Sequence, residues 1–163
     1  MSDNNSIRKQ EINDRFYRKS LGMFSTGITV VTTLDEENNP IGMTVNSFAS
    51  VSLDPPLVLW SIDKKQPSYK TFLNSKGYAV NILSKKQLDL CNHFSSPLEN
   101  KFQNLEWKLS SNGFPLLLNS LAWFDCTTWE RYSGGDHKIL VARVNSYDSI
   151  EADPLTYWNG KIS

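Results

Sequence analysis

Small polar side chains are concentrated in residues 42–59, with the sequence GMTVNSFASVSLDPPLVL. They lie between a glycine and a Pro-Pro step, and an apolar strand follows at once. Hydroxyl and amide groups of this size let a flat ligand lie against the backbone, where exposed N–H groups reach its heteroatoms. A polar edge strand that runs into a turn has the same composition. The candidate ligand-binding residues here are Thr44, Asn46, Ser47, Ser50 and Ser52.

The second candidate for chemistry is His137, in the sequence GGDHKILV. It follows a glycine turn at the start of a predicted strand, where an imidazole can donate to a ligand carbonyl or lie beside a reacting centre. A surface histidine in a hairpin fits the same local sequence. His93, at the border between the polar and apolar faces of a predicted helix, fits a structural role better than a chemical one.

The side chains available do not support several other chemistries. The two histidines and the two cysteines, Cys91 and Cys126, are far apart and lack zinc-ligand spacing. The sequence contains no G-x-S-x-G elbow, no GxGxxG fingerprint and no Walker loop. The sequence therefore predicts no metal site and no serine hydrolase, and any dinucleotide must bind without the usual glycine loop.

Charge and hydropathy bear on partners and location. Lys plus Arg and Asp plus Glu number 17 each, so no excess positive charge attracts nucleic acid or an anionic membrane. Trp123 and Phe124 fall on opposite faces of a predicted strand, an alternation typical of core filling rather than base stacking. The N-terminus has no signal peptide, and no run reaches the ~20 apolar residues of a membrane helix. We expect a cytoplasmic protein with reduced cysteines that binds neither nucleic acid nor membrane.

The elements that position these residues are mostly strands. A chain of 163 residues predicts one domain, over residues 13–163, after a flexible tail over residues 1–12. Asn13 or Asp14 caps a helix with an apolar face, and Gly27 ends it. Apolar and β-branched runs predict strands over residues 28–34, from 41 onward, and over 57–62, 78–83, 120–132 and 137–150.

Short helices and turns connect these strands. Ser68 caps one short helix, and Ser84 with Gln87 has the form of a capping box that opens another. Residues 97–115 are mostly loop, and the sequence SGGD supplies the positive φ for a tight turn between the two long strands. Six or more strands with only short helices predict a mainly β fold that closes as a barrel.

The motifs taken in order resemble those of a known family. The segments are GMTVNSFASVSLDPPLVL, YAVNIL, ENKF, NGFPLL, GGDHKILVARV and PLTYWNGK. Together they resemble the short flavin reductases, the reductase components of two-component flavin-dependent monooxygenases. The resemblance extends over residues 16–161, and the GDH tripeptide with the SVSxDPP segment is its most specific part.

The resemblance implies a Greek-key split β-barrel with short peripheral helices, usually a homodimer, with FMN or FAD in a groove near the dimer interface. It implies an NAD(P)H:flavin oxidoreductase, in which NADH or NADPH passes a hydride to flavin N5 and the reduced flavin serves an oxygenase. Two alternatives stay open. One is a flavoprotein of the same fold that keeps its flavin for storage or for reduction of a bound substrate, and the other is a non-enzymatic interaction barrel.

The resemblance also implies roles for individual residues. It places the backbone N–H groups of Ser50, Val51 and Ser52 at the flavin pyrimidine edge. His137 is expected beside the nicotinamide as an orienting group rather than an obligatory acid or base, and Tyr157 in a C-terminal segment that closes the pocket. Where the family often has an aromatic residue near the end of this segment, Ile162 stands here. The residues expected to line the isoalloxazine and ribityl chain are Val30, Val31, Thr32, Thr33, Asn46, Ser47, Phe48, Ala49, Ser50, Val51 and Ser52, and those expected toward the phosphate are Asn81, Lys85 and Gln87.

Overall fold

A computed structural model describes residues 12–163, so the predicted N-terminal tail lies outside the described residues except for Ile12. The fold is mainly β with antiparallel sheets, as predicted. Most strands belong to one seven-stranded sheet, with the order β3-β2-β6-β9-β10-β5-β4. Its strands are β2 (Thr29–Leu34), β3 (Pro40–Val45), β4 (Ala49–Leu53), β5 (Pro56–Asp63), β6 (Gly77–Ile82), β9 (Ala122–Gly134) and β10 (His137–Ser149).

The sheet is curled into a split barrel. Its two edge strands, β3 and β4, are joined by only three residues, 46–48, so the opposite edges of the sheet must approach one another. Val45 at one edge packs in the same core cluster as Val58 and Trp60 near the other. Trp60 lies at the centre of this core, with the Phe72 and Tyr78 rings edge-on at 5.0 and 5.7 Å between ring centroids.

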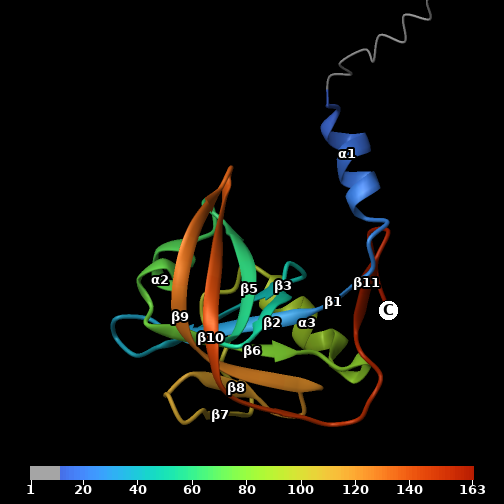
Figure 1. Cartoon of the computed structure of the whole chain (residues 1–163). Coiled ribbons are helices and arrows are strands. Elements are labelled where there is room, and N and C mark those ends of the chain that lie inside the picture. Colours follow the sequence, from blue (N-terminus) through green and yellow to red (C-terminus); the bar gives the residue numbers. More distant parts are fainter. Residues whose placement is uncertain (1–11) are drawn as a thin grey trace, which may run out of the picture.

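Short helices cover the barrel, as Figure 1 shows. They are α2 (Tyr69–Asn74), the 3-10 turn η1 (Lys85–Gln87) and α3 (Leu88–Ser95). The capping box is confirmed, because the Ser84 N–H donates to Gln87 Oε1 at 3.0 Å. Phe94 on α3 packs with Ile28, Leu83 and other residues in a second core cluster.

The region predicted as a loop over residues 97–115 is more ordered than expected. It contains β7 (Trp107–Leu109), which pairs with β8 (Pro115–Leu117). The apolar residues of β8 are buried, and the Pro115 carbonyl accepts from the Thr32 hydroxyl at 2.5 Å. Packing against the sheet therefore fixes this hairpin, which the short local pattern did not indicate.

The N-terminal helix is shorter than predicted. It is α1 (Asp14–Leu21), capped by the Asn13 side chain, which accepts from the N–H groups of Arg15 and Phe16. It ends at Gly22, because Gly27 belongs to β1 (Thr26–Gly27) and pairs with the C-terminal strand β11 (Thr156–Trp158), itself paired with β12 (Lys161–Ile162). Figure 1 shows α1 directed away from the barrel.

The long hairpin predicted near the C-terminus is confirmed. Strands β9 and β10 pair along their lengths, and Gly135 at the turn adopts a φ of +66°. The bulges at Val141/Ala142 and Val144/Ser146 interrupt the register, which bends and twists the two strands. In the described part of the chain, none of the helices has the length and apolar character needed to cross a membrane.

Candidate functional site

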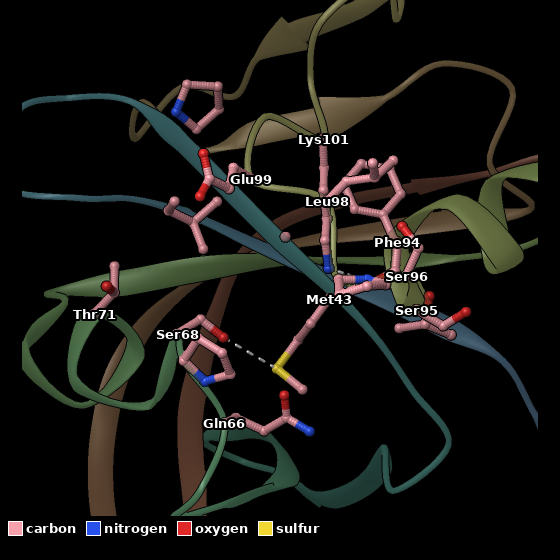
Figure 2. Close-up of a pocket in the computed structure, with 16 residues that line it drawn as sticks. Met43, Gln66, Ser68, Thr71, Phe94, Ser95, Ser96, Leu98, Glu99 and Lys101 are labelled. Carbon is pink, nitrogen blue, oxygen red and sulfur yellow. Dashed lines mark hydrogen bonds between the residues drawn. The ribbon is translucent and has the colours of Figure 1, made fainter.

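The main candidate site is a cleft of about 790 Å3 beside the edge strand β3. Three segments distant in sequence form its walls: residues 40–44 of β3, residues 66–68 with Thr71 at the start of α2, and residues 94–99 with Lys101 at the end of α3 and beyond it. Figure 2 shows their side chains converging on one space. Its volume lies in the range of small-molecule and cofactor sites.

The cleft offers many hydrogen-bonding groups and little charge. Of the described residues that line it, Lys101 is the one cation and Glu99 the one carboxylate. The Lys101 amine donates to the Phe94 carbonyl at 2.7 Å, and burial lowers the pKa of this amine from its ordinary value. The hydroxyl groups along the walls belong to Thr44, Ser68, Thr71, Ser95 and Ser96.

The wall after α3 is held in place by His93. Its Nε2–H donates to the Lys101 carbonyl at 2.6 Å, and its own carbonyl accepts from the Ser96 hydroxyl at 2.6 Å. Because a carbonyl only accepts, Nε2 must carry a proton. His93 therefore positions the segment that carries Lys101, a structural role consistent with its sequence context.

A smaller hollow of about 280 Å3 continues the cleft, since the two share Thr44 and Ser95. It brings together Asn46 and Tyr157, which are 111 positions apart (157 minus 46) and were both expected at the site. Ile162 also lines it, where the family often has an aromatic residue. The C-terminal strands thus form one wall of this side hollow.

The rest of the predicted flavin segment forms the edge of the sheet. Ser47 is tied to β5, because its hydroxyl donates to the Ser61 carbonyl at 3.1 Å and accepts from the Ser61 N–H at 3.0 Å. Phe48 stacks on Phe124 with ring centroids 5.7 Å apart. Strand β4 pairs only with β5 and contains a bulge between Ser50 and Ser52, so the segment from Ala49 to Ser52 lies outside both hollows. Its contact with a flavin stays a prediction.

The structure corrects the expectation for strand β2. Its residues Val30, Val31, Thr32 and Thr33 are wholly buried between β3 and β6, so no ligand can touch them. The two threonine hydroxyls instead bond the backbone of other segments, as in the 2.9 Å bond from Thr33 to the Gly77 carbonyl. These residues build the barrel behind the site.

Asn81 is corrected for the same reason. Its amide nitrogen donates to the Val30 carbonyl at 3.1 Å and to the Thr32 hydroxyl at 3.2 Å. Its side-chain oxygen accepts from the Leu117 N–H at 2.9 Å. The amide is wholly buried and already bonded on both atoms, so Asn81 joins β2, β6 and β8 rather than facing a phosphate.

Lys85 and Gln87 face a different surface. Both line a separate groove between η1–α3 and residues 150–153, which shares no lining residue with the cleft. Gln87 completes the capping box and donates to the Leu118 carbonyl at 2.9 Å. The contact of Lys85 and Gln87 with a phosphate therefore stays a prediction, and Lys101 is the cation at the cleft.

His137 lies at the tip of the long hairpin, half-exposed, and lines neither hollow. Its Nδ1 is 2.7 Å from Asp136 Oδ1, and this hydrogen bond lowers the pKa of the Asp136 carboxyl. His137 pairs with Asp63, and the Lys64 N–H donates to the Asp136 carbonyl at 3.0 Å. The turn after Asp63 carries Gln66 into the cleft. Residues 63–66 therefore connect the hairpin tip with the cleft.

The residues that sequence reasoning missed come from segments with weak local signals. Lys101 belongs to ENKF, a motif that supported the resemblance but received no role. Ser68 was identified only as a helix cap, although its side chain makes no capping bond and points instead to the Met43 sulfur at 3.7 Å (Figure 2). The sequence carries no signal that distinguishes this hydroxyl from that of an ordinary helix cap.

The donor set fits a flat, phosphorylated, polar organic ligand. Hydroxyl groups and a partly buried amine suit a sugar-alcohol chain and a phosphate, and the apolar faces of Met43 and Phe94 suit a ring system. Among residues 12–163, no group of three or more His, Cys, Asp or Glu side chains is arranged to hold a metal ion.

Known proteins are similar to this chain over most of its length. The sequence model named flavin reductase like domain matches residues 21–163. The reductase component of the flavin-dependent trigonelline monooxygenase from Acinetobacter baylyi is 42% identical over 161 residues, which cover 98% of this chain and 50% of that protein. The chain thus spans about half the length of this relative.

Two further proteins match along most of their own length. The FMN reductase (NADH) SmoA from Agrobacterium fabrum is 42% identical, over 91% of this chain and 84% of that protein. The solved structure of the Streptomyces globisporus NADH:FAD oxidoreductase SgcE6, in complex with NAD and FAD fragments, has a TM-score of 0.86 and 33% identity, and the match covers 92% of each chain.

Proposed function

Because the chain belongs to the flavin reductase-like domain family, we propose that it is an NAD(P)H:flavin oxidoreductase that supplies reduced flavin to a partner monooxygenase. The observation that carries the proposal is the cleft beside β3, where hydroxyl groups and one partly buried lysine converge next to apolar walls. The chemistry is a hydride transfer from the nicotinamide to flavin N5, and the chain supplies binding and alignment.

The proposed flavin site is the cleft together with the side hollow. Lys101 binds the flavin phosphate as a charge-assisted donor, and the Ser68 and Thr71 hydroxyls bind the same end. Asn46 and Tyr157 bind or cover the ring system in the side hollow. The backbone of Ser50, Val51 and Ser52 at the neighbouring sheet edge remains the proposed donor set for the pyrimidine edge.

His137 is proposed to orient the nicotinamide. Its pairing with Asp136 fixes the imidazole ring, and Gln66 on the connected turn reaches the cleft. SmoA is an FMN reductase that uses NADH, and the Streptomyces globisporus relative is an NADH:FAD oxidoreductase. The proposed substrates are therefore FMN or FAD, with NADH or NADPH as the hydride donor.

A homodimer is part of this proposal. Several large apolar side chains are exposed on the single chain, among them Phe16, Phe24, Tyr147 and Leu53, the last with 94% of its surface exposed. Large apolar side chains left exposed on a single chain support the proposal that a second copy covers part of them. A cytoplasmic location is proposed as well, supported by two buried free cysteines.

The experiment that tests the role of flavin is gel filtration of the protein after loading with FMN or FAD. A reductase that uses flavin as a substrate loses the yellow colour during the separation, and the loss is complete at high salt. Flavin that stays bound through the column would contradict the proposal and favour a flavoprotein that retains its flavin.

A further inference from the structure

The cleft continues past the point where the proposed flavin site places the phosphate. Thr44 and Ser95 join the cleft to the side hollow, where the ring system is proposed to lie. Figure 2 shows Glu99 on the opposite side of the cleft from Ser95, with the Lys101 amine between them. Residues 40–44 of β3 line the cleft and extend over about 13 Å, at about 3.3 Å per residue. A phosphate bound at Lys101 therefore leaves the space toward Glu99 open.

The carboxylate of Glu99 is free to bind a ligand. Glu99 is exposed, and the Lys101 amine donates to the Phe94 carbonyl at 2.7 Å rather than to Glu99. Within residues 12–163, no hydrogen bond and no ion pair engages this carboxylate. An ionised carboxylate only accepts hydrogen bonds and repels anions, so its partner must be a group that donates. Two neighbouring hydroxyl groups suit its two oxygens.

The walls next to Glu99 are largely apolar. Pro40 and Ile41 line the cleft at the start of β3, and Leu98 precedes Glu99 with 53% of its surface exposed. Apolar side chains of this kind cover the faces of a planar ring. Beyond the phosphate position, the cleft thus combines an acceptor for a diol with a surface for a ring. Adenosine has both features, since its ribose diol lies between the 5′-phosphate and the purine.

We propose that the far end of the cleft, defined by Pro40, Ile41, Leu98 and Glu99, binds the adenosine half of a dinucleotide and that Glu99 accepts from its ribose hydroxyls. An acidic side chain recognises the same diol in other dinucleotide-binding proteins. FAD carries adenosine directly beyond its flavin phosphate, whereas FMN ends at that phosphate. The position of Lys101 therefore favours FAD as the source of the adenosine. NADH carries the same group and is the other source.

This inference rests on the proposed function, because it extends the proposed flavin site. Its first test is isothermal titration calorimetry with FAD and with FMN. For Glu99→Gln we expect the Kd for FAD to rise about 3- to 10-fold and the Kd for FMN to stay within about twofold. The matched control is Glu130→Gln, because Glu130 is an exposed residue of β9 that lines neither the cleft nor the side hollow.

A second measurement separates FAD from NADH as the source. With riboflavin as the acceptor, NADH is the one substrate that carries adenosine. A KM for NADH that rises about 3- to 10-fold in Glu99→Gln, with an unchanged Kd for FAD, would assign the adenosine at the far end to NADH. Equal weakening of FAD and FMN, or no change in either measurement, would overturn the inference.

A third measurement requires no flavin. ADP and 2′,3′-dideoxy-ADP differ only in the two ribose hydroxyls, so the parent protein should bind ADP about 3- to 10-fold more tightly, and Glu99→Gln should bind both alike. Tighter binding of ADP by Glu99→Gln would overturn the inference, because it would show that the carboxylate repels the phosphates. Discrimination that depends on Glu99 in a protein that binds no flavin would contradict the proposed function and leave the adenosine site standing.

Discussion

Replacing Lys101 tests whether the cleft binds the flavin phosphate. Lys101 is the one cation among the described lining residues, and its amine lies 2.7 Å from the Phe94 carbonyl within the wall. A hydrogen bond to a charged group contributes about 1.5–3 kcal/mol. For Lys101→Met we therefore expect the Kd for FMN to rise by about 10- to 150-fold.

The assay is titration of FMN and of riboflavin, followed by quenching of flavin fluorescence. Riboflavin lacks the phosphate, so its Kd should stay within about threefold of the parent value. Lys70→Met is the matched control, because Lys70 is an exposed residue of α2 that does not line the cleft. If the substitution only damages the wall segment, the Kd values for FMN and riboflavin should rise equally. That result would refute the phosphate assignment.

The same assignment predicts a pH dependence. Burial lowers the pKa of Lys101, so in the flavin-free protein this amine loses its proton at a lower pH than an exposed lysine. Only the protonated amine attracts the phosphate strongly, so FMN affinity should fall as the pH rises through this lowered pKa. Riboflavin affinity should stay flat over that range, and a parallel fall for both flavins would count against the reasoning.

Other substitutions separate the parts of the site. His137→Ala should raise the KM for NADH and leave the Kd for FMN unchanged, and a collapse of FMN affinity would show that the histidine has another role. Asn81→Ala leaves the buried Leu117 N–H without its acceptor, so urea unfolding should show a loss of about 1–3 kcal/mol of stability, with any surviving folded protein still binding flavin. Gly42→Ala places a Cβ 2.6 Å from the Phe94 ring, so it should cost about 1–3 kcal/mol in the same assay, whereas unchanged stability would mean that Phe94 moves freely.

Local sequence patterns predicted the elements of the fold well. The hairpin of β2 and β3, the capping box from Ser84 to Gln87 and the long hairpin closed at Gly135 all depend on residues within a few positions of one another. The end of α1 was misplaced because Gly22 and Gly27 are both possible stops, and only the pairing of β1 with β11 decides between them. Such pairing joins distant segments, so no local pattern reveals it.

The site was predictable only in part, for the same physical reason. Asn46 and Tyr157 were expected at the site and do line the side hollow. The family resemblance implied that Asn81 lies toward the phosphate, yet its partners include backbone groups of β2 and β8. Lys101 lines the cleft because three segments that are distant in sequence come together there. The residues next to Lys101 in the sequence do not indicate this arrangement.

The most direct test of the central claim is steady-state oxidation of NADH and NADPH by the purified protein, with and without added FMN, FAD or riboflavin. We expect turnover that requires added flavin, and the rates will show which nicotinamide and which of the three flavins the protein prefers. Flavin binding without any oxidation of either nicotinamide would contradict the proposed activity. A protein that binds none of the three flavins would contradict the assignment of the cleft as well.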